Sequence, residues 1–153
     1  EVVGLIRSSK PEEVNVGLDG VRAWSARLPA ATGKTATIGF CWGGARSFAY
    51  AVAQPDLNAA VVYYGSGPSE LPTLASIKAP VLGLYGGDDA RVNATIEPVA
   101  AEMTKLGKSY ETEIYEGAGH GFLRDQAGRE GANRRATEKA WPRTIAFLRK
   151  NLG

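Results

Sequence analysis

The sequence predicts a three-layer α/β fold with a mostly parallel sheet of about four strands. Four β-prone or apolar runs alternate with helix-compatible segments, at 35–41, 59–64, 80–86 and 110–115. The run 59–64 is continuously apolar, which is typical of a parallel strand covered on both faces. Helices between such runs supply the right-handed crossovers that join parallel strands.

The first predicted helix covers residues 11–28 and precedes every strand candidate. Pro11 stands in its first turn, followed by two acids, where the helix dipole favours negative charge. Apolar residues recur at helical spacing and predict a buried stripe made of Val14, Leu18, Val21 and Leu28.

Three further helices are predicted between and after the strands, at 43–54, 94–106 and 133–151. The second of these carries one apolar face and ends at Gly107; the face consists of Ile96, Val99, Met103 and Leu106. Pro142 interrupts the last helix and predicts a kink there. The polar, glycine-rich segment 124–133 is expected to be a surface loop.

Residues 39–44, Gly-Phe-Cys-Trp-Gly-Gly, form the most informative motif. A strand that passes at once into a helix through such a motif is a nucleophile elbow, which raises one side chain above the sheet edge. Gly39 and Gly43 are expected where side chains would collide with neighbouring elements. Cys41 takes the nucleophile position and is the only cysteine, so a disulfide within the chain is excluded.

A base and an acid follow the elbow, each after its own predicted strand. His120, the only histidine, lies in a glycine-rich loop after 110–115. Asp88 and Asp89 follow 80–86, and at least one of them is expected to be a turn residue. The order nucleophile, acid, base is that of α/β-hydrolases, although a lone cysteine or histidine taken singly is more often structural.

These motifs, together with 86–92 (Gly-Gly-Asp-Asp-Ala-Arg-Val) and 117–122 (Gly-Ala-Gly-His-Gly-Phe), resemble the dienelactone hydrolase family from about Gly39 onward. The resemblance implies an α/β-hydrolase-like domain over 1–153, forming the C-terminal part of a larger fold. It implies hydrolysis of small esters or lactones through an acyl-cysteine, with a triad of Cys41, Asp89 and His120. Asp89 is preferred to Asp88 because the family's acid lies three residues before a valine, here Val92.

The resemblance and the elbow also predict residues that contact the substrate. Arg124 matches a family arginine that holds a substrate carboxylate, with a solvated loop arginine as the alternative. The N–H of Trp42, which follows the nucleophile, is the expected oxyanion donor. Tyr64 and Phe122, with Tyr85, are expected to line an apolar pocket, unless they belong to the core.

The front of the chain departs from the family, whose members are longer. The elbow comes 38 residues after the start, and a loop carrying a second oxyanion donor is not recognisable. An alternative function is therefore a catalytically impaired hydrolase-like binding domain; thioesterase or peptidase-like acyl transfer is a third. We expect a missing N-terminal portion or a second copy of the chain to cover the open edge of strand 35–41.

Composition narrows the remaining classes. The 153 residues carry a net charge of +2 without a basic stripe, which does not favour nucleic acid. No apolar run approaches the length of a membrane span. One histidine with dispersed acids offers no metal site, and the Gly65–Pro68 loop has the wrong spacing for a dinucleotide, so no cofactor is expected. One cysteine suits a reducing compartment, although the periplasm stays open.

Overall fold

The computed structural model describes residues 4, 6 and 8–153, and the chain forms two compact units, Glu1–Thr35 and Ala36–Gly153. In the first unit, helix α2 spans Pro11–Ser25, with the proline and the two acids in its first turn as predicted.

The buried stripe predicted for this helix is not observed. None of the residues of α2 is buried, and Val21 and Leu28 are 64% and 42% exposed, while Val14 and Leu18 are only half-buried. The described part of this unit contains no strand, so the apolar side chains of α2 have no sheet within their own unit to cover. The amphipathic spacing predicted the helix correctly but not its burial.

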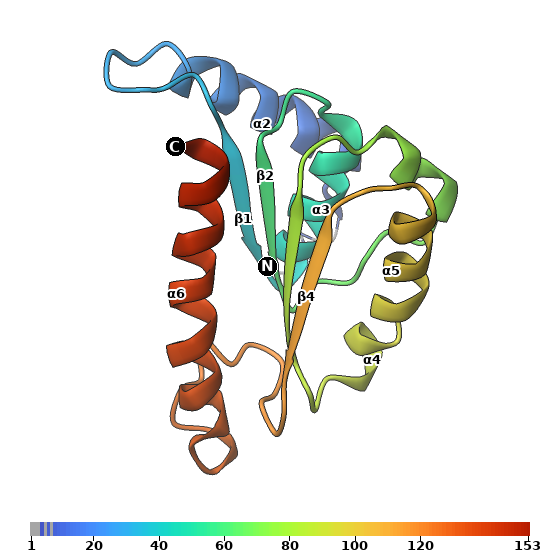
Figure 1. Ribbon diagram of the computed structural model, residues 1–153, viewed down its shortest axis with the longest axis vertical. Helices are drawn as coiled ribbons and strands as arrows, with labels where there is room; N and C mark the ends of the chain where they lie inside the picture. Colours follow the sequence, from blue (N-terminus) through green and yellow to red (C-terminus); the bar gives the residue numbers. More distant parts are fainter. Residues whose placement is uncertain (1–3, 5, 7) are drawn as a thin grey trace. The chain divides into compact units, whose positions relative to one another are not determined.

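The second unit contains a parallel sheet of four strands, as predicted (Figure 1). The strands follow one another across the sheet in chain order and are β1 (Ala36–Phe40), β2 (Ala59–Tyr63), β3 (Val81–Gly86) and β4 (Tyr110–Tyr115). Phe40 pairs with Tyr63 and Gly86 with Tyr115, so the carboxyl ends of all four strands meet at one edge. Ligands of open α/β sheets bind at this edge.

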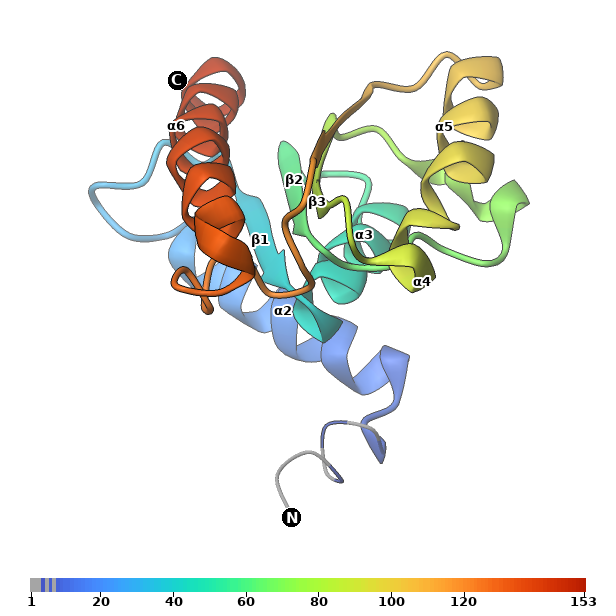
Figure 2. The ribbon, with the colours of Figure 1, turned by 90° about the horizontal axis from the view of Figure 1, so that it is seen from below.

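Helices cover both faces of the sheet and complete the three layers (Figure 2). Helices α3 (Trp42–Ala53) and α5 (Ile96–Lys105) lie on one face, and α6 (Ala132–Leu152) lies on the other. The unit also contains the short α-helix α4 (Ala90–Asn93) and two 3₁₀ helices, η1 (Leu71–Ser76) and η2 (Arg129–Gly131). Helix α6 continues through Pro142, and α5 buries Ile96, Val99 and Met103, as its spacing predicted.

The core is continuous through strand β2, whose five residues are all buried, as the apolar run predicted. On the α6 face, the Tyr63 hydroxyl lies 2.7 Å from Oγ1 of Thr144 and donates to the carbonyl of Ala140 at 3.3 Å. On the other side of the sheet, the hydroxyls of Tyr85 and Tyr110 lie 2.6 Å apart. The two buried contacts of Tyr63 fix the position of α6 on the sheet.

Strands β1 and β4 form the two edges of the sheet. Ile38 and Phe40 on β1 are 40% and 41% exposed, and Ile114 on β4 is 52% exposed. The prediction that another polypeptide covers β1 stays a prediction. No helix in the described part of the chain combines the length and apolarity needed to cross a bilayer.

Candidate active site

Cys41 stands at the turn between β1 and α3 in a backbone conformation that few residues adopt. Its φ is 56° and its ψ is −118°. Such strain at a non-glycine residue costs about 1–3 kcal/mol and persists only where surrounding contacts enforce it. Here the Cys41 N–H donates to the Tyr63 carbonyl at 3.0 Å, while its own carbonyl accepts the N–H of Ala45 at 3.2 Å. The two bonds extend the β1–β2 ladder and begin helix α3, leaving the thiol exposed.

Two glycines make this sharp turn sterically feasible, and one of them differs from the prediction. A Cβ on Gly39 would lie 1.8 Å from the Gly43 carbonyl oxygen, which confirms the crowding expected there. A Cβ on Gly43 would meet nothing within 4 Å, so the expectation for that residue is wrong. The crowded residue is Gly44, whose Cβ would lie 2.6 Å from the Tyr63 carbonyl oxygen. The reason is that Gly44 faces β2, whereas Gly43 faces open space.

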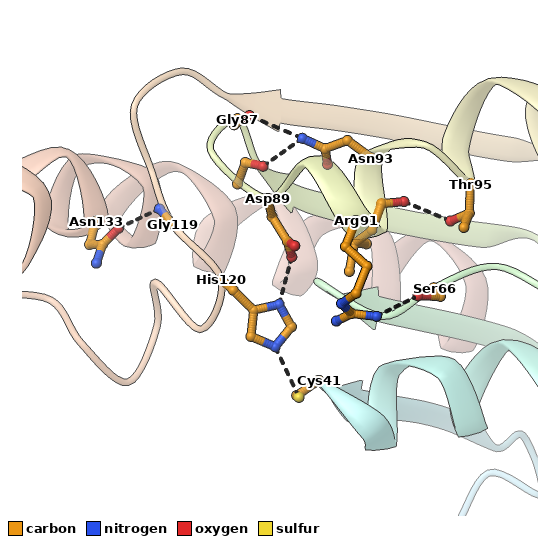
Figure 3. Close-up of polar contacts among 12 residues, drawn as sticks. Cys41, Ser66, Gly87, Asp89, Arg91, Asn93, Thr95, Gly119, His120 and Asn133 are labelled. Carbon is orange, nitrogen blue, oxygen red and sulfur yellow. Dashed lines mark hydrogen bonds and ion pairs between the residues drawn. The ribbon is translucent and has the colours of Figure 1, made fainter.

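The structure brings the three predicted triad residues into one hydrogen-bonded chain (Figure 3). Nδ1 of His120 lies 2.5 Å from Oδ2 of Asp89, and Nε2 of the same ring lies 2.9 Å from Sγ of Cys41. A carboxylate accepts hydrogen bonds only, so Nδ1 carries the proton of the first contact, and Nε2 is the ring nitrogen that faces the sulfur. Asp89 is 7% exposed and the His120 side chain 33% exposed. The Asp89 carboxylate is therefore enclosed, while the His120 imidazole and the Cys41 thiol remain accessible.

The neighbouring Asp88 has a different role from Asp89. Its carboxylate accepts a hydrogen bond from Arg129 at 2.8 Å, and its backbone N–H donates to the Ala118 carbonyl at 2.9 Å. Asn93 holds the same turn by donating to the carbonyls of Gly86 and Gly87 at 2.9 and 3.1 Å. The turn between β3 and α4 is therefore fixed on both sides of Asp89.

A cavity of about 360 Å³ opens beside the sulfur and is lined by Phe40, Cys41, Tyr64, His120, Gly121, Leu123 and Arg124. Tyr64 and Arg124 thus lie where the sequence predicted pocket residues. Phe40 and Leu123 were missed, although each directly precedes a predicted site residue. A larger cavity of about 660 Å³ beside the Asp88–Arg129 pair has no triad residue among those that line it.

Phe122 was predicted to line the pocket, but the structure places it in the core. It is fully buried, and its ring centroid lies 5.2 Å from that of Tyr64 and 5.5 Å from that of Tyr115. Gly121 turns the chain with a φ of +76°, which sends the next side chain into the core. Tyr85 is likewise 1% exposed and belongs to the core. Of the two, Phe122 supports the pocket from behind through its contact with Tyr64.

Tyr64 lies between the core and the cavity. It has a left-handed φ of 38°, is 4% exposed, and meets the His120 ring edge-on with centroids 5.3 Å apart. Burial raises the pKa of the Tyr64 phenol to about 12; the nearby Tyr63 and Cys41 add to this, and Arg124 opposes it. The phenol is therefore neutral at ordinary pH.

Trp42 is the first residue of α3, so its N–H has no carbonyl within the helix to bond. Trp42 directly follows Cys41, the predicted nucleophile, which is the position from which an oxyanion donor is expected. Its exposed ring lies under the guanidinium of Arg46, whose carbon is 5.7 Å from the ring centroid. Among the described residues, no three His, Cys, Asp or Glu side chains gather as metal ligands.

A parallel sheet with a strained elbow after β1, an aspartate after β3 and a histidine after β4 defines the α/β-hydrolase class. The chain belongs to the dienelactone hydrolase family, whose model matches residues 2–152.

Individual relatives agree with this family. The chain is 34% identical over 146 residues to a provisionally assigned carboxymethylenebutenolidase of Saccharolobus solfataricus, covering 95% of this chain and 56% of the relative. It is 33% identical over 114 residues to the carboxymethylenebutenolidase of Pseudomonas putida, covering 73% of this chain and 48% of the relative. A provisionally assigned dienelactone hydrolase structure from Klebsiella pneumoniae has a TM-score of 0.83 and 29% identity, over 94% of this chain and 63% of that one. The chain thus spans about half the length of the two sequence relatives.

Proposed function

We propose that this chain hydrolyses small esters or lactones with Cys41 as nucleophile, His120 as base and Asp89 as the orienting acid. The observation that carries the proposal is the unbroken series of contacts from sulfur through both ring nitrogens to the carboxylate. This arrangement is that of a catalytic triad, in which the acid holds the imidazole in one tautomer and stabilises its protonated form.

The reaction follows from these positions. Nε2 of His120 takes the thiol proton as the sulfur attacks the substrate carbonyl, and a tetrahedral oxyanion forms. The N–H of Trp42 donates to this oxyanion. As the intermediate collapses, the carbon–oxygen bond to the leaving alkoxide breaks, and His120 returns the proton to that oxygen. An acyl-cysteine remains. His120 then deprotonates a water, which attacks the thioester, and the sulfur leaves and regains its proton.

The cavity supports a substrate that combines an apolar body with a carboxylate. Phe40, Tyr64 and Leu123 supply apolar surface, while Arg124 supplies the only lysine or arginine side chain among the residues that line the cavity. A guanidinium pairs well with a planar carboxylate. A volume of about 360 Å³ lies at the lower end of the range of small-molecule pockets. We therefore infer that small acidic esters or lactones are preferred to neutral ones.

Hydrolysis of p-nitrophenyl acetate, followed from the first turnover, tests the nucleophile. The wild-type chain is expected to release nitrophenol continuously, and Cys41→Ala to release none above background while keeping its melting temperature. A burst that stops at one acyl group per chain would support the alternative, an impaired binding domain. Undiminished hydrolysis by Cys41→Ala would contradict the assignment.

The substrate preference is tested separately with Arg124→Ala and a matched pair of acidic and neutral nitrophenyl esters. We expect kcat/KM for the acidic ester to fall by about 10-fold or more, the worth of a charge-assisted hydrogen bond, with the neutral ester unchanged. Arg91→Ala is the matched control, because Arg91 donates to Ser66 and does not line the cavity. Equal losses for both esters would contradict a role for Arg124 in recognising the carboxylate.

A further inference from the structure

Asn133, near the start of α6, makes two hydrogen bonds to the loop that carries His120, one buried and one partly buried. Its side chain is 1% exposed. Oδ1 accepts the backbone N–H of Gly119 at 2.9 Å, and Nδ2 donates to the backbone carbonyl of Asp125 at 2.7 Å. Figure 3 shows the first of these contacts, with the amide directed at the backbone just ahead of the histidine.

The two partners of this amide flank two residues of the proposed site. Gly119 directly precedes His120, and Asp125 directly follows Arg124. One side chain therefore holds both ends of the segment that carries the base and the cation. Within the segment, Gly121 has a positive φ, and its carbonyl accepts the N–H groups of Arg124 and Asp125 at 2.9 and 3.1 Å. The two bonds of Asn133 tie this turn to α6.

An amide is the group that can make both bonds at once. It offers an acceptor and a donor on a short, planar side chain, whereas a carboxylate accepts only and an aliphatic side chain does neither. The surroundings are also tight, because a Cβ added to Gly128 would lie 3.0 Å from Nδ2. The loop is thus folded closely around the amide, which fits a role in fixing its geometry.

We propose that Asn133 is a positioning residue that holds His120 against Cys41 and Arg124 in the cavity. The proposal rests on the proposed function for its kinetic consequences. Its structural part, the orientation of the imidazole, is independent of whether the chain turns over any ester. Misplacing a catalytic group by about 1 Å costs on the order of 100-fold in rate.

Two variants separate the two bonds. Asn133→Ala removes both, and we expect kcat/KM to fall about 100-fold for acidic and neutral esters alike. Asn133→Asp keeps an acceptor for the Gly119 N–H but has no donor for the Asp125 carbonyl. We expect it to retain activity on the neutral ester and to lose about 10-fold on the acidic one, the worth of one hydrogen bond. Asn151→Ala is the matched control, because Asn151 bonds one backbone carbonyl at the far end of the same helix.

The imidazole gives a readout that needs no activity. His120 is the only histidine, so its ring protons and its Nδ1 proton give one unambiguous set of NMR signals. With spectra taken well below the lowest melting temperature, we expect the downfield Nδ1 proton to persist in wild type, Asn133→Asp and Asn151→Ala. It should be lost in Asn133→Ala, whose Gly119 N–H has no side-chain acceptor.

The outcomes decide between positioning and simple packing. A lowered melting temperature with an unchanged Nδ1 signal and unchanged rates would show that Asn133 only stabilises the fold, and would overturn the proposal. If Asn133→Ala does not fold, Asn133→Asp decides the question alone. An equal loss of kcat/KM for both esters, or no loss for either, would overturn the positioning proposal. A wild-type chain that hydrolyses neither ester, yet shows the Nδ1 signal responding to Asn133, would contradict the proposed function and support the positioning.

Discussion

The contrast between Gly43 and Gly44 gives a prediction with an internal control. Both glycines lie in the first turn of α3, and both can be changed to alanine by adding one methyl group. At Gly43 that methyl meets nothing within 4 Å. At Gly44 it would lie 2.6 Å from the Tyr63 carbonyl oxygen and 3.1 Å from the Cα of Gly65. The same chemical change should therefore have opposite signs at adjacent positions.

The magnitudes follow from helix propensity and overpacking. Alanine in place of glycine stabilises a helix by up to about 1 kcal/mol, which is the expected effect of Gly43→Ala. Gly44→Ala gains the same propensity but must displace backbone atoms, and overpacking costs about 1–3 kcal/mol or more. Because the propensity gain is common to both, the two variants should differ by the overpacking cost alone, about 1–3 kcal/mol or more in free energy of unfolding. For a chain of this size the melting temperatures would differ by about 2–12 °C.

Thermal and urea melts followed by circular dichroism measure this difference, and ester hydrolysis measures its effect on the site. The carbonyl that a methyl on Gly44 would displace is the one that accepts the Cys41 N–H. Gly44→Ala should thus lose activity, while Gly43→Ala keeps the sulfur in place. Equal melting temperatures for the two variants would refute the idea that direct backbone contact with β2 holds the elbow.

Three further outcomes are expected. Asp89→Asn should lower kcat/KM by about 10³- to 10⁴-fold, because it disturbs the histidine tautomer. Asp88→Asn breaks only an exposed ion pair and should change kcat/KM by less than about 5-fold. Similar losses in the two variants would contradict the different roles of the two acids. Tyr64→Phe keeps the ring against His120 and should lower the free energy of unfolding, measured in melts, by less than about 1 kcal/mol. Tyr64→Ala removes the ring and should lower it by about 3 kcal/mol or more. Equal losses would contradict the packing role of the ring. Burial raises the pKa of five tyrosines above the ordinary 10.0, namely Tyr63, Tyr64, Tyr85, Tyr110 and Tyr115. The stability they contribute is complete below pH 10 and lost as pH rises through the folded values, so phenolate absorbance should appear together with unfolding rather than before it.

Much of the sheet was predictable because local sequence determines it. The β4 bounds match the prediction, β2 and β3 differ by one residue at one end, and β1 differs by one residue at each end. Apolar runs and glycines mark where buried parallel strands begin and stop. Cys41, Asp89 and His120 could be located because each lies at or after the end of a predicted strand. Parallel strands bring such positions to one edge, which is why residues far apart in sequence could be expected to meet.

What the sequence did not predict depends on packing between elements. Gly44, not Gly43, is the crowded glycine because the helix lies with that residue against the β2 backbone. Phe122 lies in the core because a left-handed glycine precedes it, and spacing alone cannot show which way the chain turns. Asn133 gave no signal because its importance lies in two backbone partners on a distant loop.

The strand order has a consequence for how this chain acquires its site as it folds. Each strand pairs with the next in sequence, and paired residues such as Ala36 and Ala59 are separated by 23 positions, Val81 and Tyr110 by 29. Loop-closure entropy for such separations is modest, so neighbouring strands can join stepwise. The sulfur and the imidazole, however, are 79 positions apart and come together only after every intervening strand has docked. During refolding, the circular-dichroism signal of the helices should therefore return first, and ester hydrolysis should return last.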